Sequence, residues 1–188
     1  MNSAAAAVGT LIAGAANGAA NENTITLTQG TVQTAMAGQS TEAGASGNKL
    51  YVSGGTLTGT GYAGYAEAGA ANTNLVEVTS GSANTLYAGY APAGAADGNQ
   101  LTISGGTVAA AVAGSGSTSA SSNVVEMNQG QVGTLIGGNS TAGAADNNIL
   151  IINAGTITTS VAAGKAAAGS ASGNTLDING GNPWHHRK

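Results

Sequence analysis

NQLTISGG, residues 99–106, is the clearest copy of a motif that returns along the whole chain. In every copy an Asn is followed, two and four residues later, by Leu, Ile, Val or Met. The spacings between copies are 25, 26, 25, 24, 25 and 26 residues, and the leading residues are Asn23, Asn48, Asn74, Asn99, Asn123, Asn148 and Asn174. A fixed period of this length is typical of repeat architectures.

The repeating unit alternates in a way that favours strands over helices. In the unit TVQTAMAGQSTEAGASGNKLYVSGG, residues 31–55, two stretches of period-two alternation flank a segment rich in Ala, Gly and Ser. Positions 32, 34 and 36 are expected to share one face. Glycine falls every few residues and would cost a helix about 1 kcal/mol each relative to Ala. We therefore predict an all-β, single-stranded β-solenoid of about seven coils, with 24–26 residues per coil.

The repeats are expected to form one domain over residues 1–181, with the N-terminal residues belonging to the first coil rather than to a signal peptide. Residues 182–188 depart from the repeat and hold the single Trp, both His and half of the basic residues. This tail is expected to be a cap, or a remnant that does not belong to the repeats.

The Asn column is predicted to be a structural ladder. Equivalent residues of stacked coils lie about 4.8 Å apart, and Asn side chains at that spacing hydrogen-bond from rung to rung. Asn also tolerates the left-handed backbone of a corner, and the Gly that ends every unit, preceded by a second Gly in three of them, supplies another corner. A calcium site would instead need several carboxylates near each Asn, and only scattered single acids are present.

Three more columns keep the same phase. An apolar column precedes each Ala-Gly or Gly-Gly pair: Ile12, Met36, Tyr62, Tyr87, Val112, Ile136 and Val161. A Gly column follows it: Gly14, Gly38, Gly64, Gly89, Gly114, Gly138 and Gly164. Two residues before the apolar column lies a hydroxyl column, expected to point inward or to edge a corner: Thr10, Thr34, Thr60, Thr85, Ala110, Thr134 and Thr159.

Tyrosines gather in two consecutive units. Tyr62 and Tyr87 are expected to be partly buried, whereas Tyr65 and Tyr90 should point outward and stack on each other, with Tyr51 near them. Exposed paired tyrosines are common at binding surfaces. Tyr65 and Tyr90 are thus a candidate partner patch, and simple in-register stacking is the alternative explanation.

Charge and residue types exclude several functions. Eight acids against four basic residues, a net charge of −4, argue against nucleic-acid binding. No stretch resembles a membrane span, and no cysteine is present. Glu77, Glu126 and Asp177 occupy equivalent places two rungs apart, about 10 Å, which is too far for the paired carboxylates of a retaining glycosidase and marginal for those of an inverting one. His185 and His186 are neighbours, and neighbouring residues rarely reach one metal ion. We predict no catalytic residue, metal ligand or cofactor, and no enzyme activity.

The written-out unit, Thr-Val-x-x-x-Val/Tyr-Ala-Gly through Asn-x-Leu-x-Ile-Ser-Gly-Gly, resembles the repeats of bacterial autotransporter-type and adhesin-like surface proteins. The resemblance covers residues from about 8 to 181. It implies an extracellular or cell-surface location and adhesion to a host or cell-surface protein or glycan. It carries no functional residue with it.

The leading functional hypothesis is a non-enzymatic, extracellular structural or adhesive β-solenoid. Exposed coil ends of such a stack are able to pair end to end into filaments. One alternative is an ice-binding solenoid, which needs an outward array of Thr. The other is a carbohydrate-binding or carbohydrate-active β-helix, whose catalytic form needs an acid cluster.

Overall fold

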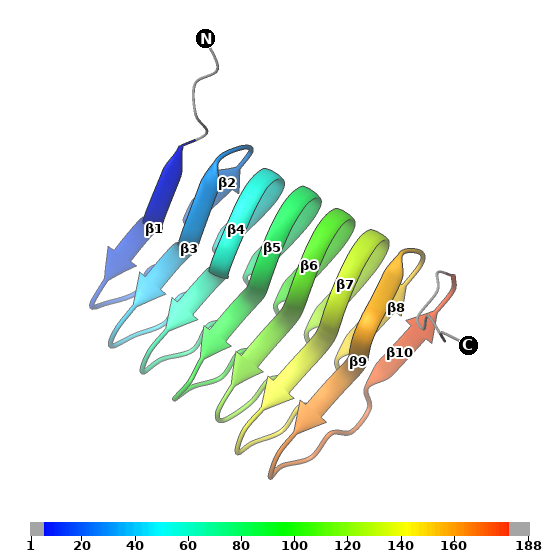
Figure 1. The fold of residues 1–188 in the computed structure, drawn as a ribbon. Coiled ribbons are helices and arrows are strands. Elements are labelled where there is room, and N and C mark those ends of the chain that lie inside the picture. Colours follow the sequence, from blue (N-terminus) through cyan, green and yellow to red (C-terminus); the bar gives the residue numbers. More distant parts are fainter. Residues whose placement is uncertain (1–5, 181–188) are drawn as a thin grey trace.

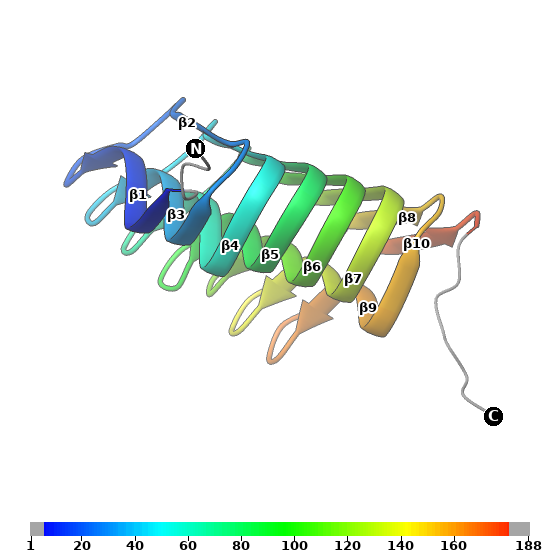
Figure 2. The same ribbon diagram turned by 45° about the horizontal axis from the view of Figure 1, so that its top comes forward.

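The computed structural model describes residues 6–180, and every regular element in this part is a β-strand. The chain winds into a stack of flattened coils, which confirms the all-β β-solenoid of about seven coils (Figures 1 and 2). The expected tail, 182–188, lies outside the described residues. The ten strands are β1 (Ala7–Ala16), β2 (Thr24–Leu27), β3 (Thr31–Ser40), β4 (Lys49–Ala66), β5 (Leu75–Ala91), β6 (Gln100–Gly116), β7 (Val124–Ser140), β8 (Ile149–Ile152), β9 (Thr156–Ala166) and β10 (Thr175–Ile178).

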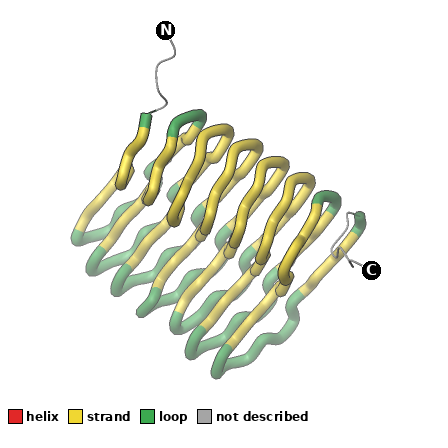
Figure 3. Tube along the Cα trace, viewed as in Figure 1, coloured by secondary structure: helices red, strands yellow, loops and turns green. Residues whose placement is uncertain are grey.

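All the strand pairs are parallel, and each coil pairs with the next at the equivalent residue of the repeat. Strands β4 to β7 each continue through the Gly-Gly or x-Gly corner, so each carries both of the strand-forming stretches of its unit. Their two halves form the two broad faces of the solenoid. The Ala-, Gly- and Ser-rich segments make turns that gather along one edge of the stack (Figure 3).

The core lies between the two faces and is built from aliphatic columns. Leu50, Val76, Leu101, Val125 and Leu150 come from one face, and all are at most 1% exposed. The other face contributes columns such as Leu57, Ala83, Val108, Val132 and Ile157. A second, smaller cluster of Ala fills the loop edge: Ala45, Ala66, Ala71, Ala91 and Ala96. Few large side chains are needed, because each coil is thin.

The seven Asn form one continuous ladder. In every step the backbone N–H and the Nδ2 of one Asn both donate to the Oδ1 of the Asn in the next coil, at 2.8–3.1 Å. In Asn48, Asn74 and Asn174 the Nδ2 also donates to a backbone carbonyl, as from Asn48 to Ala20. The five inner members, Asn48 to Asn148, are at most 1% exposed. Each of these buried amides therefore pairs with the Asn of the coil before it and the Asn of the coil after it.

The Gly column exists because the ladder leaves no space for a side chain. A Cβ at any of Gly14, Gly38, Gly64, Gly89, Gly114, Gly138 and Gly164 would meet an Asn amide atom closer than 3.0 Å. Backbone carbonyls close the space further, as Ala71 does at Gly89. The Asn and Gly columns therefore depend on each other: the Asn amide occupies the space that a side chain at the Gly position would need, although the two residues are distant within each coil.

Two corners of the coil use left-handed backbone. The second Gly of each Gly-Gly or x-Gly end has a positive φ, from 67° at Gly55 to 100° at Gly130. The other corner corrects the sequence analysis, because the left-handed residue precedes the ladder Asn rather than being that Asn. Gly occupies this position in three coils, and the remaining coils hold residues that bear the strain at φ of 55–60°: Glu22, Thr73, Ser122 and Asn147.

The predicted alternation over residues 32–36 is wrong. Val32 and Ala35 are buried, while Gln33 and Thr34 both lie toward the outside, and the same pattern of two outer residues between two buried ones recurs at residues 108–111. This irregularity places the hydroxyl column and most of the apolar column toward the outside, although Val112 of the apolar column is buried. The column that points inward is the one between them: Leu11, Ala35, Gly61, Leu86, Ala111, Leu135 and Val161.

The last coil also differs from the prediction. Thr134 pairs with Ser160 and Ile136 pairs with Ala162. Thr159 and Val161 therefore do not belong to the columns to which the sequence assigned them. Residues 158–160 replace a two-residue step with three, so Ser160 and Ala162 take the places expected for Thr159 and Val161, whereas Gly164 keeps its expected place in the Gly column.

Replacing Asn99 by Ala tests the ladder. Asn99→Ala removes the acceptor of two buried donors, the backbone N–H and the Nδ2 of Asn74. Since each unpaired buried donor costs roughly 1–3 kcal/mol, we expect the free energy of unfolding to fall by about 3 kcal/mol in a urea titration. The matched control Asn84→Ala, at an exposed position, should stay within about 0.5 kcal/mol of the wild type. Equal losses in both variants would contradict the ladder's role.

Candidate functional site

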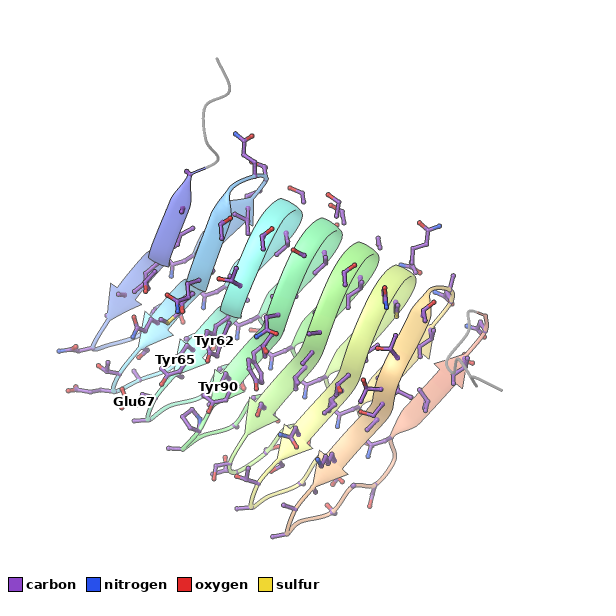
Figure 4. All side chains as sticks on the ribbon, viewed as in Figure 1. Tyr62, Tyr65, Glu67 and Tyr90 are labelled. Atoms are coloured by element: carbon purple, nitrogen blue, oxygen red, sulfur yellow. The ribbon has the colours of Figure 1, made fainter. Side chains whose placement is uncertain are left out.

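Four tyrosines form a compact cluster on the face that carries the outward Thr column. Tyr62 stacks on Tyr87 with ring centroids 5.5 Å apart and planes at 10°, and Tyr65 stacks on Tyr90 at 5.6 Å and 20°. Edge and tilted contacts of 5.0–5.5 Å join the two stacks. Figure 4 places Tyr62, Tyr65 and Tyr90 together across the neighbouring strands β4 and β5. The structure thus brings Tyr65 and Tyr90 together, and Tyr62 and Tyr87 complete their surroundings.

The stacked rings leave little free aromatic surface within the cluster. All four side chains are half-buried, and the parallel pairs cover each other's inner faces. Burial raises the pKa of the Tyr62, Tyr65 and Tyr87 phenols above the ordinary value of 10.0. The negative charge of Glu67 adds to the rise in the pKa of Tyr65, and a hydrogen bond with Thr60 offsets part of it at Tyr62.

Tyr51 lies elsewhere, contrary to expectation. It stands in the column of Thr26 and Glu77, on the first stretch of β4. There it lines a depression of about 340 Å³ together with Glu77 and Thr79. The sequence suggested proximity because Tyr51 precedes Tyr62 by only eleven residues. The Gly54-Gly55 corner turns the chain between them.

The recurring acids stay apart. Glu77, Thr102, Glu126, Ile151 and Asp177 follow one another in register, so a non-acidic residue separates each pair of acids. No other acid lines the depression beside Glu77. Within residues 6–180 no three His, Cys, Asp or Glu side chains lie close enough to hold a metal ion.

A second ladder was missed by the sequence analysis. Two residues before each ladder Asn stands a short polar residue, and in most steps its side chain accepts the backbone N–H of the equivalent residue one coil on. Asp97 accepts from Ser121 at 2.7 Å and Asp146 accepts from Ser172 at 2.6 Å. The signal was present as the column Asn21, Ser46, Asn72, Asp97, Ser121, Asp146 and Ser172. These acids therefore have a structural role.

An elongated groove crosses the same face as the Thr column. It has a volume of about 490 Å³, and its edges are polar or small side chains, including Ser82, Asn84, Thr107, Ala109, Gln131 and Thr158. The outward residues on either side of a buried column form the two walls. That column, Leu57, Ala83, Val108, Val132 and Ile157, follows five consecutive rungs. At about 4.8 Å per rung the groove extends for roughly 19 Å along the axis.

Comparison with known proteins gives no relative: no protein-family model, curated protein or solved structure matches this chain. The described part of the chain contains no helix of the length and apolar character that a membrane span requires.

The raised tyrosine pKa values predict how stability responds to alkali. The fold favours the neutral phenols, so the unfolded chain releases these protons at a lower pH than the folded chain. The contribution to stability is fully present below pH 10.0 and is lost as pH rises through the folded-state pKa values. We expect phenolate absorbance to show late-titrating groups, and Tyr87→Phe to remove one of them. Five phenols titrating together at the ordinary pKa would contradict the described cluster.

Proposed function

We propose that this protein is a non-enzymatic structural and adhesive rod of the extracellular space or bacterial cell surface. The observation that carries the proposal is the continuous Asn ladder. It joins all seven coils through buried side-chain amides and fixes the rod along its whole length. The separated acids and the structural roles of Asp97 and Asp146 support a non-catalytic function. The resemblance of the repeat unit to autotransporter-type and adhesin-like repeats supports the location.

The ends of the described stack support assembly of copies end to end. Val8 is 39% exposed at one end, and Leu176 and Ile178 are each 44% exposed at the other. The equivalent residues of inner coils, such as Leu150 and Ile152, are at most 1% exposed. A neighbouring copy in the same register would cover these side chains.

The ladder gives the two ends complementary chemistry. Each Asn donates to the next one toward the C-terminal end. Among the coils described, Asn23 has an Oδ1 that no other coil uses, and Asn174 has no further Asn to which its backbone N–H donates. In head-to-tail stacking the backbone N–H of Asn174 in one copy faces the Oδ1 of Asn23 in the next, so the ladder continues. In head-to-head stacking two Asn23 oxygens would face each other. The proposed assembly therefore has all copies pointing in the same direction.

Self-association is tested with a charge placed at the C-terminal rung. Ile178→Lys sets a cation where a neighbouring copy would bury it, which is costly for an unpaired charge. We expect wild-type protein to form growing species in sedimentation velocity and rods in electron microscopy, and Ile178→Lys to shift association to at least tenfold higher concentration. The control Thr175→Lys, an exposed residue of the same strand in the outward column of Ile149, should associate like the wild type. A wild-type protein that stays monomeric at high concentration would remove the assembly proposal.

Ice binding is a second candidate, and the outward hydroxyl column favours it. Thr34, Thr60 and Thr85 lie in register after Thr10, and Thr134 and Ser160 continue this column beyond Ala110, which interrupts it. The sequence argument against ice binding expected these residues to point inward or to edge a corner, and the inward orientation is wrong.

Thermal hysteresis measures this second function directly. Wild-type protein should show hysteresis that Thr85→Lys reduces several-fold by interrupting the column. Thr102→Lys, on the opposite broad face in the column of Glu77, should keep it. Absence of hysteresis in the wild-type protein would eliminate this candidate.

A further inference from the structure

We propose that the axial groove of about 490 Å³ binds a linear, uncharged oligosaccharide. This inference deepens the adhesive part of the proposed function, because it names the ligand class that the rod would hold. The volume lies within the range of roughly 300–1,000 Å³ that is usual for ligand clefts. The groove is much longer than one sugar ring, since it follows five rungs of the solenoid.

The polar side chains of the walls are available to a ligand. Asn84, Thr107 and Gln131 are exposed, and no hydrogen bond within residues 6–180 engages their side chains. Ser82 donates only weakly to the neighbouring Thr56, at 3.3 Å. The walls thus offer amide and hydroxyl groups that both donate and accept, repeated along the axis. Hydroxyls of a sugar chain have the same dual character.

The lining excludes charged polymers. None of the groove residues is acidic or basic, so neither an anionic nor a cationic chain finds a counter-charge. Lys49 and Lys165, the two cations of the described part, do not line the groove. Anionic polymers such as nucleic acids and uronic-acid chains depend on cationic side chains for affinity.

Apolar ligands and extended peptides fit poorly as well. A purely apolar ligand would cover the amide and hydroxyl groups of Asn84, Thr107 and Gln131 without pairing them, which is unfavourable. A peptide that binds by strand addition needs a free sheet edge. Strand β6 beneath the groove is paired on both sides, with β5 and β7. The ligand class left by these constraints is a neutral chain recognised through its hydroxyl groups.

The test uses three neutral hexasaccharides, cellohexaose, maltohexaose and mannohexaose, with an oligogalacturonate as the anionic comparison. Isothermal titration measures each Kd with the full chain. We expect at least one neutral hexasaccharide to bind and the oligogalacturonate to bind at least tenfold more weakly. Thr107→Trp, an exposed position in the middle of one wall, should fill the groove and weaken binding at least tenfold. Thr102→Trp carries the same substitution to the outward column of the opposite broad face and should leave Kd within twofold.

Binding of none of the three neutral hexasaccharides would overturn the proposal, as would equal effects of the two Trp variants or a preference for oligogalacturonate. Circular dichroism and sedimentation of both variants check that folding and assembly are unchanged. The sedimentation result also separates the two proposals. A protein that assembles but binds no sugar refutes the groove alone, whereas one that binds sugar as a monomer refutes the assembly alone.

Discussion

The buried Asn amide is the constraint on which the other features of the solenoid depend. An amide with 0–1% exposure must have partners for its oxygen and both its protons, and here the neighbouring coils supply them. A coil that slipped by one residue would leave these groups unpaired and turn its aliphatic residues outward. The ladder therefore fixes the register of every rung. It also requires Gly on the facing stretch, so a single polar residue determines what is allowed on both sides of the coil.

Each coil contacts only its neighbours, and its inward and outward side chains have different roles. The inward side chains stabilise the stack, whereas the outward ones are free to vary. The inner columns repeat with small changes in size, whereas the outward columns vary from Tyr to Val to Ala along one row. Stability in such an architecture is close to a sum of coil and interface terms. An outward substitution leaves those terms nearly unchanged. A surface of this kind is free to acquire a tyrosine cluster at β4 and β5 and a polar groove across β4 to β9 without altering the frame.

Much of the frame could be predicted from the sequence, because its signals are strictly periodic. The Asn and Gly columns and the Gly-Gly corners occupy the positions that the period assigns to them, and the in-register stacking of Tyr65 on Tyr90 follows from the same period. The orientation of Thr34 could not be obtained this way. Simple alternation places it with Val32, but the irregular step at Gln33 adds a second outward residue. Nothing in the local sequence marks that step.

The misassignment of Thr159 and Val161 and the failure to predict the groove have the same origin, which is the irregular step between the buried column and the hydroxyl column. Thr158 and Thr159 look like a continuation of the hydroxyl column, yet one of them is an insertion that moves Ser160 into it. The groove is invisible in the sequence, because its walls combine residues from five coils whose only common property is to lie beside the irregular step. The depression beside Tyr51 was likewise hidden by the corner at Gly54-Gly55.

The uniform direction of the Asn hydrogen bonds has an electrical consequence. Every side-chain amide is oriented with its oxygen toward the previous coil and its nitrogen toward the next. These amide dipoles add along the axis and polarise one another. The Asn ladder thus contributes a dipole moment parallel to the length of the solenoid, with its positive end toward β10 and its negative end toward β1. In an external electric field, or beside a charged surface, this dipole would favour one orientation of the long axis of the molecule over the opposite one.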